Sequence, residues 1–159
     1  MTEIIISAPN AVVNGNRDTG SIYIVKGGIG NRTINVDSSS FDLVVRIDGE
    51  SLFSRFGFSI ACVGDIDCDQ KPDFAVGAPL ADTGTLTLAG KVYILYGRDI
   101  NSSSTLVNST IFEGYENSQG YGTSLAVKNG RLLIGAPRTN KDTGRTYLVD
   151  LYTGQIITE

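Results

Sequence analysis

The chain has 159 residues, of which 41% are hydrophobic and 19% are charged, so it can bury the core of one domain, which excludes a disordered segment. Its net charge is −4 and its 13 Lys and Arg residues are scattered, which excludes general nucleic-acid binding. It has no His, which excludes histidine-based catalysis and a His-ligated zinc site, and no apolar run of the 18 or so residues that membrane insertion needs.

Residues 1–50 predict the first three strands of the chain. Apolar, β-branched runs at 4–6, 22–25 and 43–47 are typical of short strands, with Gly, Asn and Asp in the turns between them. The first strand ends in the sequence IIISAP, and the second belongs to the sequence GSIYIV. Both motifs recur later, which makes this segment the first of several related units.

Residues 51–116 form the second unit, in which the two motifs return as FAVGAP and GKVYIL. A further strand precedes them here and has no counterpart in the first unit. We expect four strands in this unit, at 56–63, 74–77, 91–96 and 110–112.

Residues 117–159 form the third unit, with the motifs LLIGAP and GRTYLV. We expect four strands here, at 121–127, 132–135, 145–150 and within 155–158. Asn129 and Gly130 lie between the first two of these strands, and Asn-Gly between two hydrophobic runs is a strong signal for a tight β-hairpin. The first two strands of each complete unit are therefore predicted to be antiparallel neighbours.

The predicted fold class is all-β. Four-stranded antiparallel sheets repeated in tandem are the blades of a β-propeller. We predict a partial propeller of about three four-stranded antiparallel blades, with the first blade incomplete, over 1–50, 51–116 and 117–159. Two complete blades and part of a third do not close a ring of about seven, so their outer faces are expected to contact further blades or a second copy of the chain.

The second unit alone carries an aspartate-rich insertion between its first two strands. The chain runs 20 residues from Gly57 to Gly77 but 13 from Gly122 to Gly135. The candidate ligands are the side chains of four aspartates and one backbone carbonyl: Asp65, Asp67, Asp69, Asp73 and Lys71. Hard oxygen ligands at alternating loop positions suit Ca²⁺, and we predict one structural calcium site.

Two other interpretations of this loop fit its residues less well. Most aspartate-rich loops are exposed, solvated turns, but four carboxylates in so short a loop repel one another unless a cation lies among them. An EF-hand needs Gly at the sixth position, Glu at the twelfth and flanking helices. Gln70 and Val76 occupy those two positions and the flanks are predicted strands, so the loop is not an EF-hand.

Cysteine and sequon patterns bear on the compartment. Cys62 and Cys68 are either disulfide-bonded, as an oxidising compartment would favour, or two unrelated thiols. Asn31, Asn101 and Asn108 each begin an N-x-[ST] sequon in a segment between strands. Together with the calcium loop, these sequons favour an extracellular or cell-surface location.

The repeated motifs resemble the FG-GAP repeats of the integrin α-subunit propeller family. Phe56 with Gly57 matches the FG element and residues 77–79 match the GAP element, while Tyr121 with Gly122 and residues 135–137 repeat the pair. Residues 7–9 are a looser third match. Gln70 departs from the family loop, which usually has Gly there. As a signature of function the resemblance is weak, because propellers serve many roles.

The resemblance implies a calcium-stabilised propeller segment of an extracellular adhesion or ligand-recognition protein. Its expected partner is a protein or extracellular-matrix ligand, with no nucleic acid involved. The alternative is an accessory, non-catalytic propeller of a secreted enzyme, such as a glycosylphosphatidylinositol-specific phospholipase D-like hydrolase. We expect no catalysis by this chain itself, because it has no nucleophile elbow, phosphate-binding loop or base beside Ser124.

Overall fold

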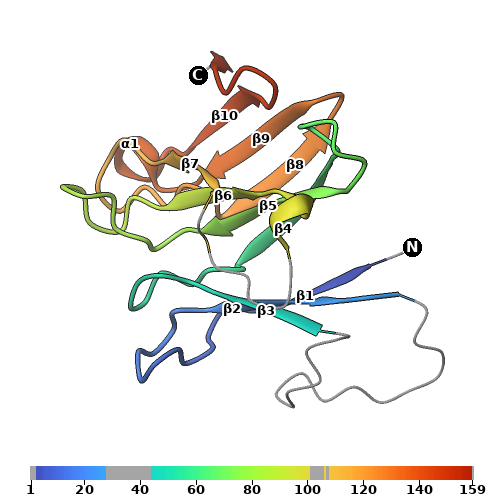
Figure 1. The fold of residues 1–159 in the computed structure, drawn as a ribbon. Helices are drawn as coiled ribbons and strands as arrows, with labels where there is room; N and C mark the ends of the chain where they lie inside the picture. The colour runs from blue at the N-terminus through green and yellow to red at the C-terminus, as the bar shows by residue number, and fades with distance from the viewer. Residues whose placement is uncertain (1–2, 28–43, 101–105, 107, 159) are drawn as a thin grey trace.

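The computed structural model describes residues 3–27, 44–100, 106 and 108–158, which form three antiparallel sheets (Figure 1). The first sheet has three strands in the order β1-β2-β3: β1 (Ile4–Ala8), β2 (Ser21–Val25) and β3 (Val44–Asp48). Each strand pairs with the next along the chain, and the register joins Ile4 to Val25 and Ser21 to Asp48. This sheet is the incomplete blade expected from the sequence.

The second and third sheets each have four strands that also pair in chain order. The second contains β4 (Ser59–Gly64), β5 (Asp73–Ala78), β6 (Lys91–Leu95) and β7 (Thr110–Glu113). The third contains β8 (Ser124–Lys128), β9 (Arg131–Ala136), β10 (Arg145–Asp150) and β11 (Ile156–Thr158). Two short helical turns, η1 (Gly97–Asp99) and α1 (Thr139–Asp142), lie between strands. The prediction of an all-β partial propeller is confirmed.

The two largest clusters of buried apolar side chains lie one on each face of the middle sheet. Because side chains alternate along a strand, Tyr93 and Leu95 of β6 pack toward the first sheet, while Val92 and Ile94 pack toward the third. All six residues of β5 are buried. Ile94 is 1% exposed, and full burial of such a side chain contributes about 1.5–3 kcal/mol to folding. The three sheets are therefore held together face to face, as the stacking in Figure 1 shows.

The predicted strand at 56–63 was wrong at its start, because β4 begins at Ser59. Phe56 is instead fully buried between the first two sheets: its N–H donates to Thr19 O of the first blade at 3.0 Å, and its ring meets that of Tyr93 in β6 edge-on at 5.3 Å. The strand predicted at 121–127 likewise begins late, at Ser124, and Tyr121 N–H donates to Ala89 O at 2.9 Å. The aromatic residue of each FG element is fixed to the previous blade, which keeps it out of the sheet that follows.

This docking requires a very close approach of two backbones. A Cβ on Gly20 would lie 2.1 Å from Phe56 O, and a Cβ on Gly90 would lie 2.2 Å from Tyr121 O. Both glycines have positive φ, +85° and +92°, a conformation that side chains disfavour. The glycine that opens GSIYIV and GKVYIL is therefore the contact point between blades.

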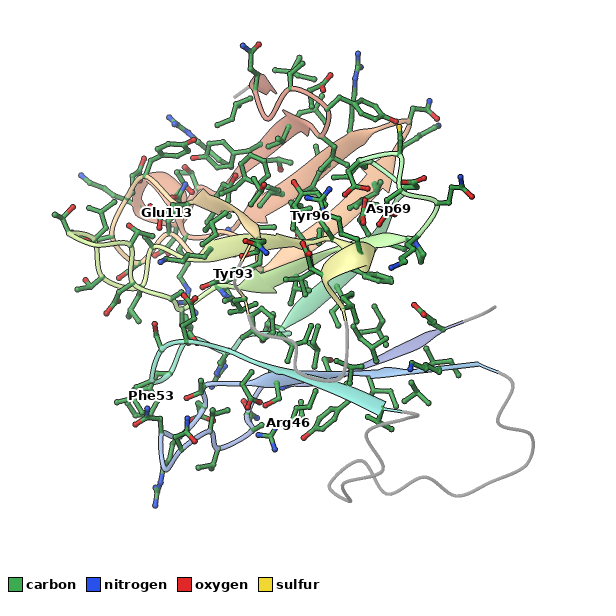
Figure 2. The ribbon with its side chains drawn as sticks, in the orientation of Figure 1. Arg46, Phe53, Asp69, Tyr93, Tyr96 and Glu113 are labelled. Carbon is green, nitrogen blue, oxygen red and sulfur yellow. The ribbon has the colours of Figure 1, made fainter. Side chains whose placement is uncertain are left out.

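The loops of the two complete blades fall on two opposite rims. The turn from β4 to β5, which carries Asp69, lies at one end of the strands, and the loop from β3 to β4, which carries Phe53, lies at the other (Figure 2). The predicted tight hairpin at Asn129 and Gly130 is confirmed, since both have positive φ and Lys128 pairs with Arg131 across the turn. In the described residues, no helix is long and apolar enough to span a membrane.

Candidate metal centre

The aspartate-rich segment forms a loop between two antiparallel strands, β4 and β5. Gly64 and Asp73 are the last paired residues, so the loop occupies residues 65–72. The absence of flanking helices agrees with the sequence argument against an EF-hand. One rim of the second blade thus carries the four aspartates singled out from the sequence.

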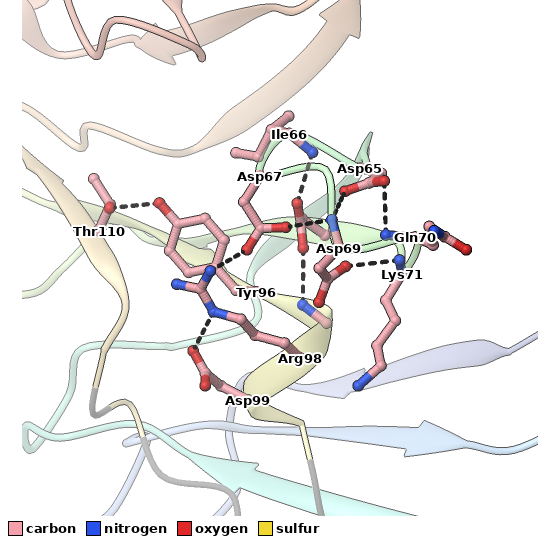
Figure 3. A network of polar contacts seen from close by, with 12 residues as sticks. Asp65, Ile66, Asp67, Asp69, Gln70, Lys71, Tyr96, Arg98, Asp99 and Thr110 are labelled. Carbon is pink, nitrogen blue, oxygen red and sulfur yellow. Dashed lines mark hydrogen bonds and ion pairs between the residues drawn. The ribbon is translucent and has the colours of Figure 1, made fainter.

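Backbone N–H groups hold the loop in a tight curl (Figure 3). Asp65 accepts the N–H of Asp69 on Oδ1 and that of Gln70 on Oδ2, both at 2.9 Å. Asp69 accepts the N–H of Lys71 at 2.7 Å. Gln70 has φ +70° and Cys68 has φ +63°, where each costs roughly 1–2 kcal/mol relative to Gly. The turn that usually takes Gly therefore forms with Gln70, at the expense of local strain.

Asp73 ties the loop to the segment after β6. Its side chain is fully buried, and its two carboxylate oxygens accept the N–H groups of Ile66 and Gly97, each at 2.8 Å. Gly97 is needed here, because a Cβ on it would lie 2.5 Å from Pro72 O. Burial raises the pKa of Asp73, the two hydrogen bonds oppose that shift, and the nearby charges of Asp67 and Asp69 add to it.

Three of the predicted ligands converge. Asp65, Asp67 and Asp73 each place a carboxylate oxygen within 4.8 Å of the others. Asp69 is not a member of this group, although its Oδ2 is buried and accepts no hydrogen bond. Lys71 lies in the same loop with an exposed side chain, and its ammonium points away from the carboxylates (Figure 3). The predicted Asp69 and Lys71 ligands therefore stay predictions.

The donor chemistry fits a hard divalent cation. Carboxylate oxygens are the ligands that Ca²⁺ prefers, and three that gather this closely repel one another without a counter-charge. Asp67 Oδ2 and Asp69 Oδ2 are both buried and accept no hydrogen bond, although Asp67 Oδ2 forms an ion pair with Arg98. When bound, a cation would supply positive charge and additional coordination, and Asp65, Asp67 and Asp73 would hold it.

Arg98 is a charged neighbour of the site that sequence reasoning missed. It belongs to η1, and its Nη1 lies 2.7 Å from Asp67 Oδ2 (Figure 3). This distance makes the two side chains an ion pair. The sequence offered no local signal for this contact, because β5 and β6 separate Arg98 from the loop. In the third blade the residue at the matching position, Tyr152, also covers the turn between the first two strands.

The cysteine and sequon predictions have mixed outcomes. Cys62 and Cys68 are both exposed free thiols, so the alternative of two unpaired cysteines holds in this structure. Asn108 is exposed in a turn and open to modification, though no glycan is shown. Asn31 and Asn101 lie outside the described residues.

Tandem four-stranded antiparallel blades, each docked on the one before, define the class of protein as a β-propeller segment. Comparison with known proteins gives the family. The family model described as FG-GAP repeat matches residues 56–95, which run from the docking Phe56 through β6. The chain belongs to the FG-GAP repeat proteins and is an integrin α-like propeller segment.

The similar proteins fall into two groups. Phosphatidylinositol-glycan-specific phospholipase D of Mus musculus is 33% identical over 110 residues, 69% of this chain and 13% of the relative. The Dictyostelium discoideum protein of the same name is 28% identical over 155 residues, 86% of this chain and 16% of the relative. Integrin alpha-PS3 of Drosophila melanogaster is 33% identical over 85 residues, 54% of this chain and 7% of the relative. The chain thus spans about an eighth of the length of the first curated relatives it matches.

Proposed function

We propose that this chain is a calcium-stabilised, non-catalytic propeller segment of an extracellular or cell-surface protein that recognises a protein or extracellular-matrix ligand. The observation that carries the proposal is the convergence of Asp65, Asp67 and Asp73 at the long loop between β4 and β5, next to Asp69 Oδ2, which is buried and accepts no hydrogen bond. The ion has a structural task there, because Asp73 joins the loop to β5 and to the segment after β6.

Replacement of Asp67 tests the calcium proposal. We expect Ca²⁺ at a hundred times its Kd to stabilise the wild-type chain by about 2.7 kcal/mol, which corresponds to a rise in Tm of roughly 5–10 °C. Asp67→Ala should abolish this rise because it removes one of the three converging carboxylates. Thermal unfolding followed by circular dichroism with EDTA and with CaCl₂ measures it.

The matched control is Asp99→Ala, which removes an acidic side chain on the same rim that lies 3.5 Å from Arg98 and outside the three-residue group. It should keep the calcium-dependent rise. If Asp67→Ala keeps the full rise as well, the loop is not the calcium site.

A second candidate function is an accessory propeller attached to a secreted hydrolase. The phospholipase D relatives support it, because they align with 69% to 86% of this chain, whereas the integrin relatives align with 54% to 77%. The sequence that flanks this segment in the complete protein discriminates between the two. A metal-dependent hydrolase domain supports the accessory role, whereas further blades followed by stalk domains and a membrane span support adhesion.

The outer face of the third sheet fits a further blade as partner. In the second sheet, Ala75 of β5 pairs with Ile94 of β6, and both are buried against the third sheet. Leu133 of β9 and Leu148 of β10 are the matching pair in the third sheet. Here Leu133 is 42% exposed. Ser59 Oγ donates to Gly122 O of the next blade at 2.6 Å, and Ser124 occupies the matching position of the third sheet. The third blade therefore has, on its outer face, the same strand pairing and the same serine position with which the second blade contacts the third.

Self-association of the isolated chain tests this face. We expect residues 1–159 to associate in sedimentation velocity, and Leu133→Lys to lower the sedimentation coefficient toward that of a monomer, because a charge on the apolar face opposes its burial. Tyr152→Lys is the control, since Tyr152 is exposed in a turn beyond the face. A wild-type chain that is well folded and monomeric at every concentration contradicts the proposal.

A further inference from the structure

We propose that Arg98 competes with the cation for Asp67. Its guanidinium neutralises Asp67 when no ion is bound and thereby weakens the affinity of the aspartate loop for Ca²⁺. This inference rests on the proposed calcium site and adds a residue that sets its affinity. Arg98 is not a ligand, because its guanidinium has no acceptor atoms.

The first support is the geometry of the pair. Arg98 Nη1 lies 2.7 Å from Asp67 Oδ2, and the side chains of Arg98 and Asp67 are 51% and 14% exposed. The arginine thus reaches from solvent onto a carboxylate that is mostly withdrawn from water. Asp67 is also one of the three converging carboxylates, so the guanidinium and a cation would bind the same side chain.

The second support is that Arg98 has other partners. Its Nε lies 3.5 Å from Asp99 Oδ2, and its guanidinium carbon lies 5.0 Å from the centre of the Tyr96 ring. Tyr96 is held in turn by a 2.8 Å hydrogen bond between its hydroxyl and Thr110 Oγ1. A guanidinium displaced from Asp67 by an ion therefore keeps an ion pair and a cation–π contact, which lowers the cost of exchange.

The third support comes from the repeat. In the third blade, the residue that matches Arg98 is Tyr152. Its ring lies against Gly130, so that a Cβ added to Gly130 would be 2.3 Å from the nearest ring atom. In both blades, then, the segment after the third strand covers the turn between the first two. The covering residue is the aromatic Tyr152 over the short Asn-Gly turn and the cationic Arg98 over the aspartate loop. Arg98 thus complements the negative charge of the loop, beyond what packing alone requires.

Electrostatics gives the direction and size of the effect. A guanidinium bound to a ligand carboxylate lies within several ångströms of the ion and repels it. Even with the full screening of bulk water, one unit charge at about 6 Å from a divalent ion changes its affinity by about ten-fold. Removal of the charge should therefore tighten calcium binding, while the metal-free loop loses the guanidinium that neutralises Asp67.

The experiment is calorimetric titration of the whole chain with CaCl₂, comparing wild type with Arg98→Gln, Arg98→Lys and Lys71→Gln. We expect Arg98→Gln to lower the Kd about ten-fold, and to lower the Tm in EDTA but not in saturating Ca²⁺. Arg98→Lys keeps the charge and should restore the wild-type Kd. Lys71→Gln removes the same charge from an exposed, outward-pointing side chain in the loop and should change the Kd by less than about three-fold.

Two results would overturn the inference: an unchanged or raised Kd in Arg98→Gln, or equal tightening by Lys71→Gln, which would indicate a general effect of net charge. If Arg98→Gln unfolds in EDTA, competition with a chelator from the calcium-loaded state gives its Kd. A wild-type chain that shows neither binding heat nor a calcium-dependent Tm refutes the proposed site itself, whereas calcium binding that ignores Arg98 refutes this inference alone.

Discussion

Gly90→Ala is expected to lower the free energy of unfolding by about 3 kcal/mol or more, because it places a methyl group between two blades. The new Cβ would lie 2.2 Å from Tyr121 O and 2.6 Å from Tyr121 N, and both are backbone atoms that cannot rotate away. The N–H of Tyr121 that donates to Ala89 O at 2.9 Å would be displaced with them. Urea unfolding followed by circular dichroism measures the change.

Gly84→Ala separates the two causes of this loss. Gly84 lies in the same loop between β5 and β6, and its φ is also positive at +55°, but no atom lies within 4 Å of an added Cβ. Gly84→Ala should lower the free energy of unfolding only by the backbone strain of a positive φ, about 1–2 kcal/mol. Equal losses in the two variants would mean that the contact between blades contributes nothing beyond the conformation of the glycine.

The strands of the chain could be predicted because their signals are local. The runs that became β5, β6, β9 and β10 combine β-branched residues with turn residues on both sides, and Asn129 with Gly130 fixed a hairpin by itself. The start of β4 could not be predicted in this way. Phe56 is an aromatic residue of the kind that favours strands, and what keeps it out of β4 is a backbone hydrogen bond to Thr19 of the preceding blade, together with burial of its ring against Tyr93 of its own blade.

In the candidate site, too, the local features could be predicted from the sequence, whereas the contacts between distant segments could not. The spacing of Asp65, Asp67 and Asp73 was sufficient to predict that their carboxylates meet, because alternate residues of a curled loop face inward. The spacing also suggested Asp69, whose Oδ1 instead accepts the N–H of Lys71. Arg98 is separated from the loop by two strands, β5 and β6, so only the fold brings its charge to Asp67.

Asp73→Ala should have the largest effect of any substitution in the loop, and its effect should depend on calcium. It leaves the partly buried N–H groups of Ile66 and Gly97 without an acceptor, which costs roughly 1–3 kcal/mol each, less the relief of repulsion from Asp67 and Asp69. We expect a loss of about 2 kcal/mol in EDTA. With Ca²⁺ at a hundred times the wild-type Kd, the loss of the ion should add about 2.7 kcal/mol.

Asp82→Ala is the matched comparison, because Asp82 also accepts a backbone N–H, that of Leu88 at 2.8 Å, in an exposed loop that contains no carboxylate cluster. Asp82→Ala should lower the free energy of unfolding by about 1 kcal/mol, and by the same amount in EDTA and in Ca²⁺. Urea unfolding of both variants under both conditions gives the four values. An Asp73→Ala loss that is equal with and without calcium would show that Asp73 holds the loop to the sheet by hydrogen bonds alone and contributes nothing to an ion.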